Sequence, residues 1–191
     1  MKRLIFIRHA ETELAGRFCG HTDPPLNGRG RLQVAGLITR LEAEAIEEIY
    51  SSDLLRAAET AHLLAKAFSV PCITTPNLRE INFGAWEAKT WVEISRSDPD
   101  FALRWAQSFP DLTAPGAEFF SAFKSRVLQE IRHLTHCAAH KRIAVVTHAG
   151  VMRIVLRELL GRTEQEAWAA TKPYCSYFVY AGTLAPEKVS H

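Results

Sequence analysis

Leu4-Ile5-Phe6-Ile7-Arg8-His9 is the stretch that decides the fold, because four consecutive apolar residues run directly into a polar pair. A continuous apolar run of this kind is typical of a strand that is buried on both faces of a parallel sheet. The run is too short for a signal-peptide core or a membrane span. His9 is therefore expected at the end of a central strand, where α/β proteins bind their ligands.

A second stretch repeats this arrangement near the other end of the chain. The β-branched run Ile143–Thr147 is followed by His148-Ala149-Gly150 and then by an amphipathic helical pattern. Two histidines are thus expected in the same topological place. Arg8 precedes the first, and the backbone amides of Ala149 and Gly150 follow the second, so that both offer hydrogen-bond donors to an anion. Together these residues predict a phosphate pocket.

Strands and helices alternate along the rest of the chain. Expected strands span 48–52, 71–75 and, at an edge, 177–180; expected helices span 30–41, 53–68, 118–134 and 151–159. Ser52 or Asp53 is expected to cap the second helix, with Arg56 in its first turn. The pattern predicts an α/β fold, a three-layer α/β/α sandwich with a mainly parallel sheet. Short helical patterns predict a small helical cap at about 86–118 within one domain of residues 1–191.

Composition limits the function classes. A chain of 191 residues with 47% hydrophobic residues can bury one substantial core, and its net charge of +2 argues against a dedicated nucleic-acid binder. The four cysteines (19, 72, 137 and 175) lack paired spacing, which suits reduced thiols in the cytoplasm. We expect a cytoplasmic protein that binds a small phosphorylated metabolite, not nucleic acid or a membrane. The oligomeric state stays open, with a homodimer as one option.

Four blocks in the same order resemble the histidine phosphatase superfamily, the phosphoglycerate mutase-like proteins. These blocks are Leu4–Thr12, Ser52–Ala61, Leu78–Glu87 and Val146–Arg153. The resemblance covers nearly all of residues 3 to 160. It implies a phosphoglycerate mutase-like fold and phosphoryl transfer through a phosphohistidine, without a metal or another cofactor.

The resemblance also implies a role for each site residue. His9 corresponds to the nucleophile, Arg8, Arg56 and His148 to the groups that grip the phosphoryl oxygens, and Glu80 to the proton donor. These roles make physical sense, since an imidazole with an ordinary pKa of about 6.5 offers a free lone pair near neutral pH. Phosphoryl transfer mainly requires positioning and neutralisation of charge, which cationic side chains supply.

Two departures from the family pattern concern the loop after the nucleophile. Ala10 stands where the family usually has glycine, and Ala15 and Gly16 occupy the region of a phosphate-binding asparagine. Cys19 and the Gly20 amide match a loop that often lies near substrate. We therefore expect Cys19 and Gly20 to contact the substrate, with Cys19 as a contact and not as a nucleophile.

The substrate is suggested by a longer resemblance. The runs 78–94 and 115–118 are similar to the α-ribazole phosphatases of cobalamin nucleotide-loop assembly. Trp86 and Trp91 can offer a flat surface to a benzimidazole ring or anchor the cap in the core, and the core role is favoured for Trp91. The alternatives are a phosphoglycerate mutase, which typically has a longer cap, a broad-specificity small-molecule or sugar-phosphate phosphatase, and a catalytically silent phosphate-binding module.

A separate cluster of metal-ligand residues lies at helical spacing. His133, His136, Cys137 and His140 could bind zinc, but no acidic partners accompany them, and histidines are common at helix ends. We expect no metal site.

Overall fold

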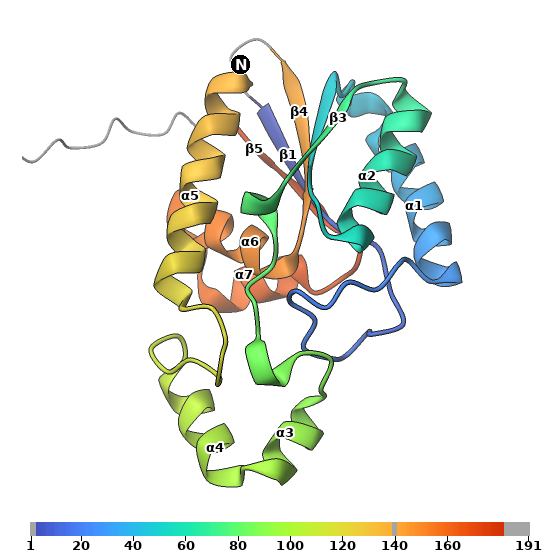
Figure 1. The fold of residues 1–191 in the computed structure, drawn as a ribbon. Helices are drawn as coiled ribbons and strands as arrows, with labels where there is room; N and C mark the ends of the chain where they lie inside the picture. Colours follow the sequence, from blue (N-terminus) through green and yellow to red (C-terminus); the bar gives the residue numbers. More distant parts are fainter. Residues whose placement is uncertain (1–2, 139–140, 182–191) are drawn as a thin grey trace, which may run out of the picture.

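The computed structural model describes residues 3–138 and 141–181, which form a five-stranded sheet between layers of helices (Figure 1). The strands are β1 (Arg3–Arg8), β2 (Glu48–Ser52), β3 (Cys72–Thr75), β4 (Arg142–Thr147) and β5 (Tyr177–Tyr180). The α-helices are α1 (Gly28–Leu41), α2 (Leu55–Phe68), α3 (Trp91–Ser97), α4 (Pro99–Ser108), α5 (Phe120–Cys137), α6 (Ala149–Ile154) and α7 (Glu164–Thr171). Short 3-10 segments at Glu42–Glu44, Pro76–Leu78 and Gly84–Trp86, and a π-helix at Val155–Leu159, complete the described elements.

The sheet has the strand order β3-β2-β4-β1-β5. The first four strands are parallel, and β5 pairs antiparallel with β1 at an edge. The predicted α/β fold with a mainly parallel sheet is confirmed. Residues that lie far apart in sequence meet at its centre, because Arg8 at the end of β1 pairs with Thr147 at the end of β4.

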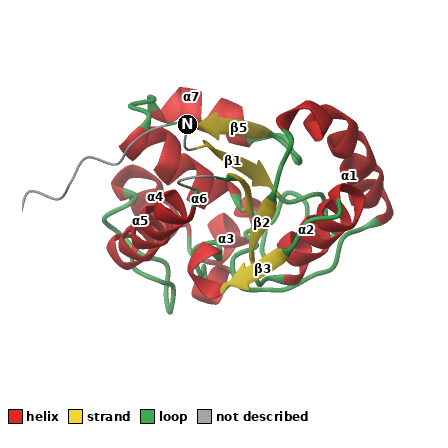
Figure 2. Cartoon of the chain, turned by 90° about the horizontal axis from the view of Figure 1, so that it is seen from above, coloured by secondary structure: helices red, strands yellow, loops and turns green. Residues whose placement is uncertain are grey.

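The two faces of β1 explain the layers. Alternate side chains point to opposite faces of a strand, so Ile5 and Ile7 belong to one apolar cluster and Leu4 and Phe6 to the other. The first cluster is covered by α1 and α2 and the second by α5 and α6, which lie on opposite sides of the sheet in Figure 2. The buried apolar run of β1 therefore requires helices on both faces.

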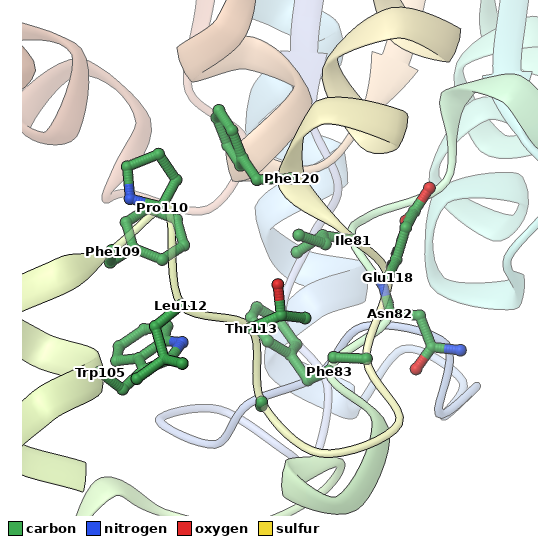
Figure 3. A pocket seen from close by; sticks show the side chains of 12 residues that line it. Ile81, Asn82, Phe83, Trp105, Phe109, Pro110, Leu112, Thr113, Glu118 and Phe120 are labelled. Carbon is green, nitrogen blue, oxygen red and sulfur yellow. Dashed lines mark hydrogen bonds between the residues drawn. The ribbon is translucent and has the colours of Figure 1, made fainter. Parts of the chain in front are cut away.

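Helices α3 and α4 lie beyond the carboxyl ends of the strands (Figure 1). They have a small core of their own around Trp86, Ile94 and Ala102. A pocket where α4 and the loop after it meet the loop 81–83, drawn in Figure 3 with Trp105, Phe109 and Phe83 among its lining residues, has a volume of only about 20 Å³. This volume admits about one water molecule, so the pocket in Figure 3 cannot hold a metabolite.

Some local expectations were wrong. Leu54 is the N-cap residue of α2, and no side chain caps the helix from that position. Helix α7 was not foreseen, because its polar and apolar residues show little helical periodicity. None of the helices in the described ranges is long and apolar enough to cross a membrane.

Candidate active site

The two predicted histidines lie side by side at the carboxyl edge of the sheet. They directly follow the paired residues Arg8 and Thr147, and their ring centroids are 5.1 Å apart. Both side chains are buried, with His9 7% and His148 0% exposed. The strand register alone therefore brings these two imidazoles together from opposite ends of the chain.

The backbone fixes the tautomer of His9. Its Nδ1 lies 2.7 Å from the carbonyl oxygen of Ala10. A carbonyl oxygen only accepts hydrogen bonds, so Nδ1 must carry the ring proton and Nε2 keeps its lone pair. Ala10 itself does not need the backbone freedom of glycine, because its φ is not positive and its amide donates to Thr60 Oγ1.

Ser52 contacts the second imidazole. The Oγ of Ser52 lies 2.9 Å from Nε2 of His148 and also accepts a hydrogen bond from the amide of Leu54. A serine hydroxyl can donate its proton to Nε2, and the ring proton of His148 then lies on Nδ1, which has no partner among the described residues. In that tautomer His9 presents a bare nitrogen and His148 presents an N–H donor.

The Arg8 side chain is held in place by residues at the end of α7 and in the turn that follows it. Its Nη1 donates to the carbonyl oxygens of Thr171 and Lys172, and its guanidinium stacks over the ring of Tyr174, with Cζ 4.1 Å from the ring centroid. The backbone amide of Arg8 donates to the carbonyl of Ser176. These contacts fix the guanidinium beside His9.

Arg56 is completely buried and organises the loop 19–22. Its terminal nitrogens donate to the carbonyl oxygens of Cys19, Gly20 and Thr22 at 2.7 to 3.1 Å. The amides of the same loop donate to Glu87, which accepts from Gly20, His21 and Thr22 as well as from Phe83. Burial raises the pKa of Glu87, but these hydrogen bonds outweigh it and hold the pKa below its ordinary value. Arg56 therefore binds the carbonyl oxygens of the loop 19–22 and Glu87 binds its amides, so that together they fix its conformation.

Three buried nitrogens of this cluster have no hydrogen-bond partner among the described residues. They are Nε of Arg8, Nε of Arg56 and Nδ1 of His148. Unpaired buried donors are costly, at about 1–3 kcal/mol each, and are rare outside binding sites. Their concentration around His9 indicates a site for an anion with several acceptor oxygens.

Burial and positive charge act together on the two imidazoles. Desolvation, followed by the charges of Arg56 and Arg8, lowers the pKa of His9 well below its ordinary value. Burial and Arg56 lower the pKa of His148 in the same direction. Both rings are therefore neutral near pH 7, and His9 has an available lone pair.

Glu80 lies in the irregular loop between β3 and α3, beside Gly150, which is two residues after His148. Its two carboxyl oxygens accept hydrogen bonds from the amides of Ile81 and Gly150, both at 2.9 Å, and the residue is 8% exposed. A side chain at position 150 would collide with it, because a Cβ there would lie 2.1 Å from Oε1. The glycine after His148 thus lets the carboxylate approach the site.

A cavity of about 450 Å³ opens from Glu80 toward the helices beyond the sheet. Its aromatic lining comes from the loops after β1 and β3, from α3, from α4 and the residue after it, and from α5 and α7: Phe18, Phe83, Trp91, Trp105, Phe109, Phe120, Phe123 and Trp168. Arg153 enters this cavity with its guanidinium 3.8 Å from the ring centroid of Trp168. The cavity is large enough for a mainly apolar, drug-sized group.

The two tryptophans that were considered for substrate contact, Trp86 and Trp91, differ in how deeply they are buried. Trp86 is 6% exposed, and its ring centroid lies 4.9 Å from that of Trp105 in the small core around α3 and α4. Trp91 is 39% exposed and lines the cavity. The core role favoured for Trp91 is therefore wrong: Trp86 occupies the core, because the two side chains lie on different elements.

Other predicted contacts lie near the site with their own partners. The Gly20 amide is engaged by Glu87, so it is not free for a substrate, contrary to our expectation. Cys19 is half-buried, and burial raises its pKa, which disfavours a nucleophilic thiolate. Ala149 directly follows His148 and is buried.

The described residues contain no group of three or more histidine, cysteine, aspartate or glutamate side chains placed to hold a metal. His133 contacts Cys137 at 3.7 Å on α5. His140 lies outside the described residues.

Several residues of the site were missed from the sequence. Ser52, Glu87 and Tyr174 act through contacts that depend on strand register and loop packing. Arg126 on α5 also supports the site, because it donates to the carbonyl oxygens of Arg79 and Glu80. An unbroken helical pattern gives no signal that one of its arginines holds a distant loop.

Comparisons with known proteins agree with this geometry. The sequence model of the histidine phosphatase superfamily (branch 1) matches residues 4–183. The chain is 31% identical to the adenosylcobalamin/alpha-ribazole phosphatase of Escherichia coli K12, over 87% of this chain and 83% of the relative. It is 30% identical to phosphoserine phosphatase 1 of Hydrogenobacter thermophilus, over 94% of this chain and 86% of the relative.

A solved structure supports the same assignment. The crystal structure of the alpha-ribazole phosphatase from Shigella flexneri superimposes with a TM-score of 0.82 at 28% identity, over 93% of this chain and 89% of that chain. The fold class and the resemblance to the phosphoglycerate mutase-like proteins are thus confirmed. The chain belongs to the histidine phosphatase superfamily and is a phosphatase.

Proposed function

We propose that this phosphatase hydrolyses α-ribazole 5′-phosphate through a phosphohistidine at His9. The observation that carries the mechanism is the set of three unpaired buried donors around an imidazole whose Nε2 is bare. Arg8, Arg56 and His148 would bind the phosphoryl oxygens and neutralise charge that develops on them.

The first half of the reaction transfers the phosphoryl group to the protein. Nε2 of His9 attacks phosphorus, the N–P bond forms and the ester P–O bond breaks. The proton of the Glu80 carboxyl group passes to the leaving alkoxide, and the Ala10 carbonyl stabilises the positive charge on the ring through Nδ1–H. General acid catalysis of this kind is worth about 10²–10⁴ in rate.

The second half returns the protein to its starting state. The Glu80 carboxylate takes a proton from a water molecule, whose oxygen attacks phosphorus. The N–P bond breaks, inorganic phosphate leaves, and His9 regains its lone pair. No metal is needed, because the cationic side chains neutralise the phosphoryl group.

The choice of substrate is supported by the aromatic cavity. α-Ribazole carries a flat benzimidazole ring on a ribose, and stacking on aromatic side chains suits such a group. The cavity begins at Glu80, where the leaving oxygen would lie, and its lining includes Trp91, Trp105 and Trp168. The likeness to α-ribazole phosphatases over most of the chain supports the same choice.

Phosphoserine is a second candidate, favoured by one cation in the cavity. Arg153 donates through Nε to Thr171 Oγ1, and its terminal nitrogens make no hydrogen bond within the described ranges. A guanidinium in this position can bind a carboxylate. Relatives named as phosphoserine phosphatases are consistent with this alternative.

A panel of substrates tests these proposals. We expect phosphate release from α-ribazole 5′-phosphate with a kcat/KM at least tenfold above that for phosphoserine, 3-phosphoglycerate, fructose bisphosphates and nucleotides, with no effect of chelator. Equal rates for all substrates would instead indicate a broad-specificity phosphatase, and a preference for phosphoserine would favour the second candidate.

A labelling experiment tests the intermediate. With a ³²P-labelled substrate, acid-labile and base-stable label is expected on the wild-type protein after rapid quenching, and none on His9→Ala. The matched control is His62→Ala, which changes a histidine on α2 outside the site. Full turnover by His9→Ala would refute the assignment of the nucleophile.

We also propose that the partner of this protein is a small phosphorylated metabolite, that residues 86–118 form a cap over the site, and that the protein works in the cytoplasm. All four cysteines are free thiols, which suits a reducing compartment.

A further inference from the structure

Tyr174 is a residue of the site to which neither the sequence patterns nor the proposed mechanism gives a role. Its ring lies between two proposed catalytic groups, with its centroid 5.7 Å from that of His9 and 4.1 Å from Cζ of Arg8. The side chain is half-buried. It therefore forms part of the wall of the phosphate pocket.

The turn that carries Tyr174 is fixed by Arg8 itself. The guanidinium binds the carbonyl oxygens of Thr171 and Lys172, just before the tyrosine, and the Arg8 amide binds the carbonyl of Ser176, just after it. Cys175 between them has a φ of +54° and is buried. A left-handed residue that is held on both sides gives the turn one conformation, so Tyr174 has a defined position relative to Arg8.

The hydroxyl of Tyr174 makes no hydrogen bond within residues 3–138 and 141–181. Burial raises the pKa of Tyr174, against the opposing charges of Arg8 and Arg56, so the hydroxyl keeps its proton at neutral pH. A protonated phenol on a ring that lies beside His9 and Arg8 is a hydrogen-bond donor in a site built for an anion.

We propose that Tyr174 is a further substrate-binding residue, whose hydroxyl donates a hydrogen bond to a phosphoryl oxygen while its ring holds the Arg8 guanidinium in place. This inference rests on the proposed role of His9 but not on the identity of the leaving group. The hydroxyl adds a second neutral donor, beside the neutral N–H of His148, to the cationic donors of Arg8 and Arg56. The phosphorylated ring of His9 is itself positively charged, so a further cation beside it would disfavour the phosphohistidine. A neutral donor binds a phosphoryl oxygen without this cost.

Hydrolysis of p-nitrophenyl phosphate, with inorganic phosphate as a competitive inhibitor, tests the role of the hydroxyl. Tyr174→Phe removes only the oxygen and keeps the ring over Arg8. Because a hydrogen bond to a charged group is worth about 1.5–3 kcal/mol, we expect kcat/KM to fall at least tenfold and the inhibition constant of phosphate to rise in parallel. Tyr174→Ala should lose more, since the stack on Arg8 disappears as well.

Tyr177→Phe is the matched control, because its hydroxyl contacts the carbonyl oxygen of Arg40 on α1, at 3.5 Å. It should keep wild-type kcat/KM and phosphate inhibition. Wild-type values for Tyr174→Phe would overturn the proposal, even if Tyr174→Ala is impaired, because the ring alone would then account for the effect. Failure of the proposed function is distinguishable, since it would appear as turnover by His9→Ala.

Discussion

The hydroxyl of Ser52 lies 2.9 Å from Nε2 of His148, whose other ring nitrogen, Nδ1, has no hydrogen-bond partner among the described residues. Ser52 is the last residue of β2, and Ser51 before it pairs with Val146 of β4. Two adjacent strands therefore place a hydroxyl and an imidazole next to each other. When the hydroxyl donates to Nε2, the ring next to His9 presents an Nδ1–H donor.

Replacing Ser52 with alanine should allow the other tautomer of His148. Without the hydroxyl, either nitrogen of the ring can carry the proton, so the phosphoryl oxygen loses an obligatory donor. We expect kcat/KM for p-nitrophenyl phosphate to fall about tenfold, the cost of one hydrogen bond to a charged group. Steady-state kinetics and the inhibition constant of phosphate measure this effect.

Ser51→Ala provides the control for that experiment. Ser51 is equally buried, but its hydroxyl donates to the carbonyl oxygen of Ser52 and not to a histidine. Its loss should reduce stability and leave the kinetics close to wild type. Equal kinetic losses in both variants would mean that the strand, and not the tautomer, is responsible.

Glu80→Gln should have an effect that depends on the leaving group. An alkyl alcohol needs a proton as it leaves, whereas p-nitrophenolate leaves without one, so the loss of the acid slows phosphoryl transfer to His9 only from the first. Because Glu80 is also the proposed base for hydrolysis of the phosphohistidine that both substrates share, the comparison uses kcat/KM, which reports phosphoryl transfer and not that later step. We expect kcat/KM for an alkyl phosphate to fall about 10²–10⁴-fold, with a much smaller change for p-nitrophenyl phosphate. Steady-state kinetics on the two substrates give the measurement.

A second variant perturbs the Glu80 side chain without replacing it. Gly150→Ala would place a methyl group 2.1 Å from Oε1 of Glu80 and displace the acid without changing its chemistry. The same selective loss on alkyl phosphates is expected. Gly36→Ala on α1, where a Cβ meets nothing within 4 Å, is the control. A uniform loss of kcat/KM on both substrates in Glu80→Gln would contradict the role as general acid.

The site residues that could be predicted from the sequence are those that directly follow a recognisable apolar strand. His9 and His148 each follow a buried apolar run, and the parallel pairing of those runs makes the two histidines neighbours. The side chains that tune them were not predictable in this way. Ser52 reaches His148 only through the register of β2 on β4, and Glu87 reaches the loop 19–22 across 65 to 67 positions in sequence.

The region of α3 and α4 shows a similar limit of prediction from sequence. Trp86 and Trp91 are only five positions apart, and both can serve a core or a cavity equally well. Which of them is buried depends on how the short helices α3 and α4 pack against each other and against Phe18. The sequence pattern predicts that these segments are helical, but which side chains they bury depends on their tertiary packing.

The lowered pKa values of His9 and His148 predict how stability depends on pH. In the unfolded chain a histidine titrates near 6.5, but in the folded protein both rings resist protonation. The unfolded state therefore binds more protons below pH 6.5, so stability is fully present above that pH and falls as the pH decreases toward the folded pKa values. Each of the two histidines should lower the free energy of unfolding by about 1 kcal/mol at pH 5.5, relative to its value above pH 6.5.

Urea unfolding at pH 7.5 and pH 5.5 measures this dependence. His9→Asn removes one of the two groups, so its free energy of unfolding should fall less than that of the wild type between these pH values, by about 1 kcal/mol. His62→Asn, which changes an exposed histidine on α2, controls for the general effect of losing a histidine. The same pH dependence in His9→Asn and the wild type would show that the ring of His9 is not held neutral.

Trp168 should contribute to the recognition of the leaving group and not to the chemistry. It is 53% exposed, lines the cavity from α7 and stacks on Arg153, so its replacement costs little core packing. An aromatic pair is worth about 0.5–1.5 kcal/mol, and Trp168→Ala should therefore raise KM for α-ribazole 5′-phosphate about three- to tenfold. The values for glycerol phosphate should stay unchanged, because a small leaving group does not reach the ring. Trp168→Phe keeps an aromatic face and should restore most of the affinity, whereas equal losses on both substrates would place the effect in the positioning of Arg153.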